Sequence, residues 1–532
     1  MNKNYLPLYF AFAIVLGIFI GSFLSGASTY SLFASKSSSN EAKIKRLIDY
    51  IQQDYVDSIN TDQLLDGAIT QILGKLDPHS VYIPKENLQQ VTENMQGNFV
   101  GIGVQFRMIK DSITVIQPIK GGPSIKAGIK AGDRILMANT DTLYGKNLSS
   151  NRVPTFLKGA ANTSVTLQVY RKTNDSLFNV ELKRGKVAIK SVDVSYMIND
   201  RIGYIKLERF ARTSYQEFKD ALNSLLQKGM TDLVLDLRGN GGGYIDIATK
   251  IIDEFLEDGK LIVFTKDNKG NIDESFATQR GSFETGGLYV LIDQNSASAS
   301  EIVAGALQDN DRGTTIGRRS FGKGLVQEEK DLGDGSAVRL TIARYYTPTG
   351  RSIQKPYEKG NGRSYSEDMN ERIRNGELLN KDSIKVVDSL QFKTPKGNIV
   401  YGGGGIVPDV FVAVDTTSYL NNFYFNTIQN FAFDLVDQNR KEFASIGIDD
   451  FISSYPIDTA YKNYLEQINT RISDSRRRLN NLYNPSEKSI QIIKQYLKAT
   501  IASQIYGDEG FYRIIQSDDK MLLKVLELDT NN

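Results

Sequence analysis

The feature that most constrains this chain is a strand-to-helix junction near its middle. An apolar run, Leu288 to Ile292, predicts a buried strand. Small residues follow, and apolar residues then recur with helical spacing at Ile302, Val303, Ala306 and Leu307. Ser298 and Glu301 have the S-x-x-E spacing of a helix-capping box. We therefore expect an α/β unit in which Ser298 lies at the start of a helix.

A serine at such a junction has two interpretations. The N–H groups at a helix start point outward and can stabilise an oxyanion, which suits a nucleophile. An ordinary N-cap serine would only satisfy the helix end. The fragment alone leaves both interpretations open.

The rarity of histidine and cysteine narrows the chemistry. The chain has one histidine, His79, and no cysteine. A Ser-His-Asp triad could use only His79, and cysteine nucleophiles are excluded. Lysine is the remaining usual base for serine, but it must be neutral, so burial or a nearby cation must lower its pKa. Lys323, between two glycines, is a candidate, although most lysines are solvated surface charges.

Two segments together carry a family resemblance. Ser-Ala-Ser-Ala-Ser-Glu at 296–301, followed by Phe-Gly-Lys-Gly-x-Val-Gln at 321–327, resembles the carboxyl-terminal processing protease (tail-specific protease) family. Those proteins are serine endopeptidases with a PDZ domain and a Ser/Lys dyad. The resemblance implies that Ser298 is the nucleophile, because 323 − 298 = 25 is the family's spacing. It implies that Lys323 is the general base and that Gln327 orients it.

A second glycine-rich junction lies upstream of the first. Residues 232–237 predict a buried strand, 238–243 read Arg-Gly-Asn-Gly-Gly-Gly, and 244–256 are helical in pattern. A phosphate-binding loop is the alternative, but neither G-x-x-x-x-G-K-[ST] nor G-x-G-x-x-G fits. The segment resembles the family's DLR-x-N-x-GG, which implies that the N–H groups of Gly242 and Ala299 form an oxyanion hole.

Residues 97–184 have the sequence pattern of β-strands and are rich in glycine. The segment 99–106, Phe-Val-Gly-Ile-Gly-Val-Gln-Phe, places a glycine loop ahead of a strand, where a peptide's carboxylate could be cradled and the peptide added as a strand. Residues 123–136 resemble the P-A-x-x-A-G-[LI]-x-x-G-D-x-I-L segment of PDZ domains. That resemblance implies a peptide-binding loop at Ile102, Gly103 and Val104.

The segment Leu-Asp-Pro-His-Ser-x-Tyr at 76–82 resembles one that precedes the PDZ domain in the family. Pro78 disfavours helix at Asp77, and Asp, Pro and Ser favour a turn. We therefore expect it to end an amphipathic helix predicted from about 61 to 76. We assign His79 a structural role, with a catalytic imidazole as the less favoured alternative. Asp309 matches an acidic position of the family and is not expected to be essential.

The amino-terminal segment determines the expected cellular location. Residues 6–24 form an uncharged run of 19 residues, long enough to span a bilayer. It is either a retained signal-anchor, which we favour, or a signal peptide cleaved near Ser25-Gly26-Ala27. The positive-inside rule does not settle orientation, but the family resemblance favours export. We expect a single-pass protein of the inner (cytoplasmic) membrane with an extracytoplasmic, periplasmic catalytic domain.

The expected architecture is multidomain α+β, because 532 residues are too many for one core. The expected parts are 1–27 as signal-anchor or signal peptide, 28–93 as stalk and helical region, 95–187 as a β-barrel-like PDZ domain, 190–415 as an α/β peptidase core and 416–532 as a helical region. By resemblance the core is crotonase/ClpP-like, and 355–400 form a polar insertion. The C-terminal helices are either a cap or an element for dimerisation or adaptor docking.

The expected function follows from the resemblance. It implies a serine endopeptidase that captures protein or peptide substrates by their free C-termini and cleaves extracytoplasmic proteins through an acyl-enzyme. The net charge of +2 argues against a nucleic-acid partner. No metal or cofactor is expected, since H-E-x-x-H and Cys/His clusters are missing from the sequence. Expected partners are substrates, the membrane and a homo-oligomer or adaptor. The alternative is a PDZ scaffold with an inactive peptidase core.

Overall fold

The computed structural model describes residues 11–18, 39–145, 148–416, 420, 422–473 and 486–530. By its contacts the chain divides into two units, residues 1–72 and 73–532. Two amphipathic helices, α2 (Ser39–Asp54) and α3 (Thr61–Gly74), confirm the helical pattern that the sequence predicts there.

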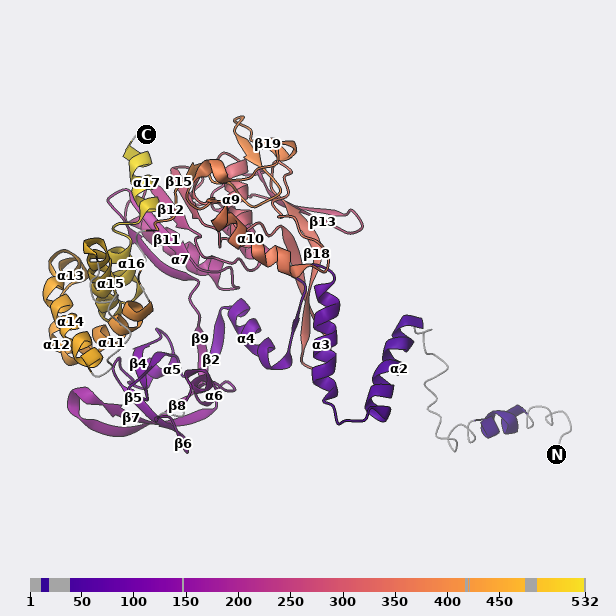
Figure 1. Ribbon diagram of the computed structural model, residues 1–532, viewed down its shortest axis with the longest axis horizontal. Coiled ribbons are helices and arrows are strands. Elements are labelled where there is room, and N and C mark those ends of the chain that lie inside the picture. The colour runs from indigo at the N-terminus through magenta and orange to yellow at the C-terminus, as the bar shows by residue number, and fades with distance from the viewer. Residues whose placement is uncertain are drawn as a thin grey trace. The chain divides into compact units, whose positions relative to one another are not determined.

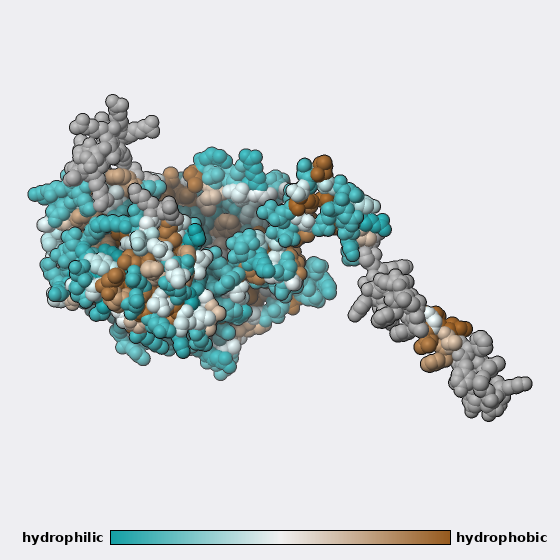
Figure 2. Space-filling model, turned by 90° about the horizontal axis from the view of Figure 1, so that it is seen from below, coloured by the Kyte–Doolittle hydropathy of each residue, from teal (hydrophilic) through white to brown (hydrophobic). Residues whose placement is uncertain are grey.

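The predicted membrane anchor lies largely outside the described residues. Residues 11–18 are helical, and Phe12, Ile14 and Val15 are exposed. This segment is the small, mostly brown group flanked by grey in Figure 2. The remainder of the apolar run 6–24 is not described. Within the described parts of the chain, no helix has both the length and the apolar character to cross a membrane. The anchor therefore stays a prediction.

A six-stranded antiparallel sheet forms the first large element of the second unit. Its order is β3 (Val104–Ile109), β4 (Ser112–Pro118), β5 (Arg134–Ala138), β7 (Ser164–Arg171), β8 (Ser176–Lys183), with β6 (Asp141–Thr142) beside β5. Two short helices, α5 (Pro123–Lys126) and α6 (Val153–Leu157), accompany it, and β2 (Asn98–Gly101) pairs with β9 (Gly185–Ala188). Alternate residues such as Val165, Leu167 and Val169 are fully buried, as expected of a sheet with one face on a core.

The central sheet of the molecule is mostly parallel. Its order is β10 (Val192–Met197), β11 (Ile202–Leu207), β12 (Asp232–Asp236), β15 (Gly287–Ile292), β16 (Thr314–Gly317), β21 (Val410–Phe411), and only β10 runs antiparallel to its neighbour (Figure 1). The strands predicted from the apolar runs at 232–237 and 288–292 are confirmed as β12 and β15. Both faces of the sheet are covered, which explains why these strands are continuously apolar.

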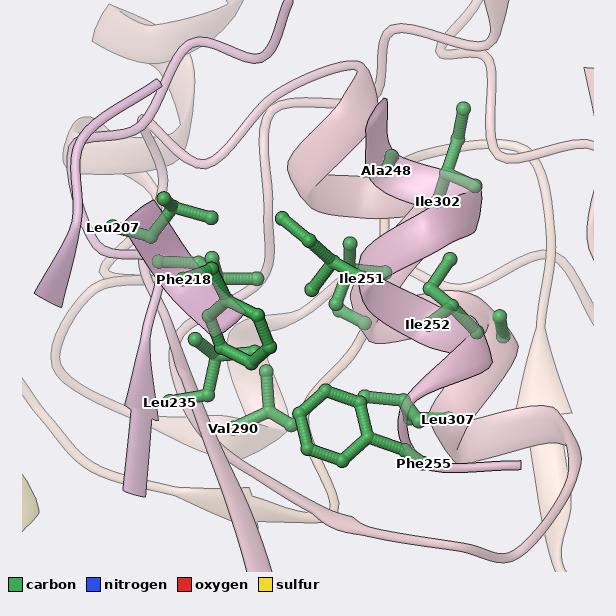
Figure 3. Close-up of a cluster of buried hydrophobic side chains, with 14 of the residues drawn as sticks. Leu207, Phe218, Leu235, Ala248, Ile251, Ile252, Phe255, Val290, Ile302 and Leu307 are labelled. Atoms are coloured by element: carbon green, nitrogen blue, oxygen red, sulfur yellow. The ribbon is translucent and has the colours of Figure 1, made fainter. Parts of the chain in front are cut away.

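Helices α7 (Ser214–Gln227), α8 (Ile245–Asp253) and α9 (Ala299–Asp309) cover one face of this sheet. Figure 3 shows Phe218 and Phe255 against strand residues such as Leu235 and Val290. On the other face, Tyr204 and its neighbours pack against α17 (Lys520–Thr530). Alternate strand residues thus enter two different cores, which fixes the register of the sheet.

A second, five-stranded sheet lies beside the first. Its order is β1 (Val81–Ile83), β18 (Ala337–Tyr346), β13 (Leu261–Asp267), β14 (Ile272–Phe276), with β17 (Leu325–Asp331) on β18. Within this sheet, β13, β14 and β17 are not anticipated from the sequence. Helix α4 (Lys85–Gln96) follows β1.

The strand order decides where functional loops meet. Strands β12 and β15 are adjacent and parallel, with Asp236 opposite Leu291. Their carboxyl ends, and that of β16, therefore lie at one edge of the sheet. The loops that carry Gly242, Ser298 and Lys323 leave from that edge, where ligands of open α/β sheets usually bind.

The polar segment 355–400 contains regular structure. It includes α10 (Gly362–Arg374) and the pair β19 (Gln391–Lys393) and β20 (Ile399–Tyr401). Glu377 receives hydrogen bonds from Arg319 at 2.7 and 2.6 Å and from Arg372 at 2.8 Å. These buried ion pairs fasten the segment to the loop that precedes Lys323.

The C-terminal helices form a separate apolar cluster. It contains α11 (Asn422–Gln438), α12 (Arg440–Phe443), α13 (Ile448–Ser454), α14 (Ile457–Ser473), α15 (Glu487–Tyr506) and α16 (Asp508–Ile515). Asp437 of α11 pairs with Arg134 at 3.1 Å and Lys172 at 3.4 Å, which ties the cluster to the β3–β8 sheet. These contacts join the cluster to the β3–β8 sheet, so a cap on the peptidase core and a role in dimerisation or adaptor docking both stay predictions.

Candidate active site

Ser298 lies in a strained turn between β15 and α9. Its backbone angles are φ 57° and ψ −115°, a region that residues other than glycine rarely adopt. Such strain costs about 1–3 kcal/mol and persists only where surrounding contacts enforce it. The N–H of Ser298 donates to the Glu301 carboxylate at 2.9 Å, which is the capping contact that the S-x-x-E spacing predicts.

The two flanking serines hold this turn in place. The Ser296 hydroxyl donates to the carbonyl oxygen of Leu237 at 2.8 Å, and the Ser300 hydroxyl donates to that of Asn240 at 2.9 Å. Both side chains are buried. Their hydroxyls thus tie the turn to the loop after β12, in agreement with the structural roles expected for them, and Ser298 alone of the three lines a cavity.

Gly242 lies directly against the Ser298 turn. Its φ is +100°, and a Cβ there would be 2.8 Å from both Ser298 Cβ and the Ala297 oxygen. Only glycine fits this approach. The Gly242 N–H, however, donates to Asn240 Oδ1 at 2.8 Å. The N–H group predicted as an oxyanion donor therefore lies beside the Ser298 turn, where it donates to a side chain.

Ala299 is the first residue of α9. The N–H groups of a helix's first turn have no partner within the helix. The Ala299 N–H therefore belongs to the set of donors at the positive end of α9, immediately after Ser298. This is the position that the sequence predicts for it.

Lys323 and Gln327 form a hydrogen-bonded pair. Lys323 Nζ donates to Gln327 Oε1 at 2.7 Å, and Gln327 Nε2 donates to the carbonyl oxygen of His79. Among the described residues, no hydrogen bond joins Lys323 Nζ to Ser298 Oγ. Catalytic hydrogen bonds are often long before substrate binds, so this geometry does not separate the two groups functionally.

Two buried side chains hold the backbones of Ser298 and Lys323 together. The Glu301 carboxylate accepts from Ser298 N–H, from Lys323 N–H at 2.8 Å, from Gly322 N–H at 2.7 Å and from the Ser320 hydroxyl at 2.5 Å. The Tyr345 hydroxyl contacts the Lys323 carbonyl at 2.7 Å and that of Ser298 at 3.2 Å. Sequence reasoning misses both clamping roles; the S-x-x-E spacing marks Glu301 only as a capping residue.

Burial shifts the titration of the groups in this region. Burial, and then the Arg339 guanidinium, lower the pKa of Lys323 below its ordinary value of 10.5. Burial, and then Lys323, lower the pKa of His79 to about 4, so its imidazole is neutral at pH 7. Burial raises the pKa of Glu301 to about 7, although its hydrogen bonds act in the opposite direction.

A cavity of about 450 Å³ joins these groups. Ser298, Lys323, Gln327 and Tyr345 all line it, together with residues 241–245, α4, β17 and β18. The remaining wall mixes apolar side chains such as Met95 and Ile302 with polar ones, including the Arg339–Glu329 ion pair of 3.0 Å. The arrangement exposes Ser298 and Lys323 to the same cavity, which an extended peptide can enter.

The predicted peptide-binding loop precedes an edge strand. Ile102 and Gly103 lead into β3, which begins at Val104 and stands at one end of its sheet. Gly103 has φ +77°, and the Ile102 carbonyl accepts from the hydroxyl and N–H of Ser124 at 2.6 and 2.9 Å. Among the described strands, only β4 pairs with β3, so its outer edge can accept an added strand.

Asp309 serves the core rather than the cavity. Its carboxylate accepts from Arg351 at 2.6 Å and from the Thr349 hydroxyl at 2.6 Å, and both charged side chains are fully buried. Asp309 is not among the residues that line the cavity. Within the described residues, no cluster of His, Cys, Asp or Glu could hold a metal ion.

Models of known protein families match successive parts of the chain. The model of peptidase family S41 matches residues 201–360, and that of the PDZ domain matches 100–182. Residues 26–87 match the activating protease CtpB N-terminal domain, and 419–507 match a family of unknown function. The expected multidomain α+β architecture with a PDZ domain and a peptidase core is thereby confirmed.

Several curated proteins are similar to most of the chain. The carboxy-terminal-processing protease of Bartonella bacilliformis is 37% identical over 346 residues, 63% of this chain and 78% of that protein. Carboxy-terminal processing protease CtpB of Bacillus subtilis is 32% identical over 316 residues, 59% of this chain and 65% of that protein. Among solved structures, the photosystem II D1 C-terminal processing protease is 26% identical, covering 70% of this chain and 87% of that chain with a TM-score of 0.36. The relationship rests on the sequence matches.

Proposed function

This chain belongs to the carboxy-terminal processing protease family, and from that premise we propose that Ser298 and Lys323 are its catalytic dyad. The family consists of serine peptidases with a PDZ domain. One observation carries the assignment of residues: Ser298 and Lys323 line one cavity, and Glu301 and Tyr345 hold the backbones of both.

The first step is proton transfer from Ser298 to neutral Lys323. The Ser298 Oγ–H proton passes to the lone pair of Lys323 Nζ as Oγ attacks the scissile carbonyl carbon. The carbonyl electron pair moves onto its oxygen. Burial favours this step because it lowers the pKa of Lys323, and so raises the fraction of neutral amine. During the transfer, Gln327 Oε1 accepts a hydrogen bond from one hydrogen of the Lys323 amine.

The oxyanion is stabilised by backbone N–H groups. Ala299 N–H, at the start of α9, is one donor. Gly242 N–H is the second, after it exchanges its bond to Asn240 Oδ1 for one to the oxyanion. Gly241, which has no Cβ to restrict its backbone, gives this loop the freedom to make that exchange.

The acyl-enzyme forms and is then hydrolysed. The Lys323 ammonium gives its proton to the leaving amine as the C–N bond breaks. Neutral Lys323 then takes a proton from water, whose oxygen attacks the acyl carbon, and the proton returns to Ser298 Oγ as the ester bond breaks. The sequence of steps consumes one water and restores both residues.

The PDZ domain is proposed to select substrates by their C-terminal carboxylate. An unstructured peptide with a free C-terminus should be cleaved with a kcat/KM about 10- to 100-fold higher than the same peptide with a C-terminal amide. The lost hydrogen bonds to the charged group account for about 1.5–3 kcal/mol. Cleavage by the full chain is measured by mass spectrometry. Acetylation of the peptide's amino terminus is the matched control and should leave the rate unchanged.

The same peptides separate this function from its alternative. Binding without cleavage would support a PDZ scaffold with an inactive core. Equal cleavage of the acid and the amide would refute capture of the carboxylate while leaving the peptidase assignment intact.

Glu301→Gln should lower kcat/KM about 100-fold. In the wild type, both carboxylate oxygens of Glu301 accept from buried N–H groups. Whichever way the new amide is oriented, its NH₂ group replaces one of these acceptors and leaves a buried N–H unpaired. An unpaired buried donor costs about 1–3 kcal/mol. The variant should also change the pH profile. In the wild type Glu301 and Lys323 must both lose a proton, so the limiting acid slope of log kcat/KM is about 2; in the variant it is about 1.

The stability of Glu301→Gln gives an independent check. The folded-state pKa of Glu301, about 7, is above its ordinary value of 4.5. The contribution of Glu301 to the free energy of unfolding is therefore greatest below pH 4.5. It falls by on the order of 3 kcal/mol as the pH rises through 7. Urea unfolding of the variant should lack this loss. If activity and stability depended on pH in the same way in Glu301→Gln as in the wild type, the role of Glu301 would be contradicted.

The proposed cellular location and assembly of the chain are based on the sequence. The apolar run 6–24 supports a retained membrane anchor, with the catalytic part outside the cytoplasm acting on extracytoplasmic proteins. The C-terminal helices would offer a surface for a second copy or an adaptor. Protease accessibility of the chain in spheroplasts tests the first assignment, since a cytoplasmic chain would be protected.

A further inference from the structure

The turn at Asp77–Ser80 is built rigidly onto the second sheet. The Asp77 carboxylate accepts from His79 N–H at 2.8 Å, Ser80 N–H at 2.9 Å, the Ser80 hydroxyl at 2.6 Å and the Thr341 hydroxyl at 3.1 Å. Asp77 and Ser80 are buried. Strand β1, directly after the turn, pairs with β18. The turn therefore has one position relative to β17 and β18.

The imidazole of His79 anchors the turn from the other side. Its Nε2 lies 2.7 Å from the Tyr365 hydroxyl, and its ring meets that of Tyr365 edge-on at 5.0 Å and that of Phe321 at 6.4 Å. The imidazole thus contacts the polar segment that contains α10 and the loop that precedes Lys323. The group that His79 presents to Gln327 is its backbone carbonyl.

That carbonyl determines which way the Gln327 amide faces. A carbonyl oxygen only accepts hydrogen bonds, so the NH₂ of Gln327 must point to it. Gln327 Oε1 must then point to Lys323 Nζ, which donates to it. A neutral amine that donates a hydrogen to Gln327 keeps its lone pair free. If the amide rotated, its NH₂ would donate to that lone pair and occupy it.

We propose that the Asp77–Ser80 turn is a positioning element for the reaction, in which the His79 carbonyl holds the Gln327 amide in the orientation that leaves the Lys323 lone pair free for the Ser298 hydroxyl. The inference rests on the proposed dyad and deepens it. His79, the sole histidine, serves through its backbone oxygen and not as a base. Where Lys323 is neutral, the turn acts on the chemistry through Gln327; at lower pH the charge of the Asp77 carboxylate also raises the pKa of Lys323.

The test is a double-mutant cycle between Asp77→Ala and Gln327→Ala. The full chain is assayed with a fluorogenic peptide on the alkaline plateau of its pH profile, where Lys323 is neutral in every variant. Asp77→Ala should lower kcat about 10- to 100-fold with KM changed less than about twofold. In the Gln327→Ala background, the same substitution should lower kcat less than about twofold, because residues that act as one unit are not additive.

Asp334→Ala is the matched control. Asp334 accepts from the N–H and hydroxyl of Ser336 at 2.8 and 2.6 Å, which makes the same kind of turn between β17 and β18. None of its described hydrogen bonds reaches Gln327 or Lys323. Its substitution should leave kcat unchanged in both backgrounds, since it tests the general effect of loosening a turn on these strands.

A second variant covers the case in which thermal unfolding shows that Asp77→Ala does not fold. Tyr365→Phe removes the partner of the His79 imidazole without changing charge. It should lower kcat about three- to tenfold in the wild-type background and less than about twofold beside Gln327→Ala.

Two results would overturn the inference. One is an equal loss of kcat in both backgrounds, which means that the turn supports the fold without acting through Gln327. The other is an unchanged kcat in Asp77→Ala or, where that variant is unfolded, in Tyr365→Phe. Full activity of a Ser298→Ala variant would instead refute the proposed dyad, so the two failures are distinguishable.

Discussion

Ser298→Ala is expected to lower casein hydrolysis by at least about a thousandfold, whereas Ser300→Ala should keep most of the activity. The first change removes the attacking oxygen. The second removes a hydroxyl that donates to the Asn240 carbonyl, which also accepts from Ala297 N–H at 3.0 Å and so stays paired. Its cost is about 1 kcal/mol of stability.

The pair of variants is matched in chemistry and differs in position. Both lose one hydroxyl within the same segment, and only Ser298 lines the cavity. Thermal unfolding of each variant shows whether a loss of activity reflects a loss of fold. Retained hydrolysis in Ser298→Ala, with loss in Ser300→Ala, would move the nucleophile to residue 300 and refute the proposed geometry.

The sequence predicts the central sheet well because its signals are local. An apolar run such as Leu288–Ile292 must be buried on both faces, and the S-x-x-E spacing locates the start of α9. Adjacent parallel strands then bring the loops of Gly242 and Ser298 to one edge. This much of the candidate site follows from residue patterns within a few positions of each other.

The contacts that hold the site together have no such local signal. Glu301 receives its other hydrogen bonds from residues 320–323, which depend on tertiary packing. Gln327 is held by the backbone carbonyl of His79. Because every residue has such a carbonyl, the sequence does not show which one holds Gln327. Strand β17 is mostly charged and half-exposed, and no alternation marks it.

The oxyanion loop shows a different limit. The resemblance leads to Gly242, and the structure places that glycine against Ser298. Which acceptor its N–H meets depends on the Asn240 side chain, whose orientation is set by its own bond to the Leu207 carbonyl at 2.8 Å. A backbone donor can be assigned from sequence, but its current partner cannot.

Lys323→Met is expected to lower kcat about 10³- to 10⁴-fold, the upper range of what a general base contributes. Methionine has a similar length and apolar stem but no lone pair of comparable basicity. Lys323→Arg is the informative companion. It keeps a cation in the cavity, but a guanidinium does not lose its proton in proteins, so it should be inactive as well. A loss in both variants assigns the requirement to a neutral amine rather than to positive charge.

The pH dependence of the wild type completes this prediction. Because burial and the nearby Arg339 lower the pKa of Lys323, kcat/KM should rise with pH along a limb whose Lys323 midpoint lies below 10.5. The pKa of His79, about 4, places its titration outside this limb, so His79→Ala should leave the midpoint in place. Stopped assays of the wild type and the three variants across pH 5 to 11 make the comparison. Activity in Lys323→Met that follows the wild-type profile would mean that some other group removes the Ser298 proton, and the dyad would fail.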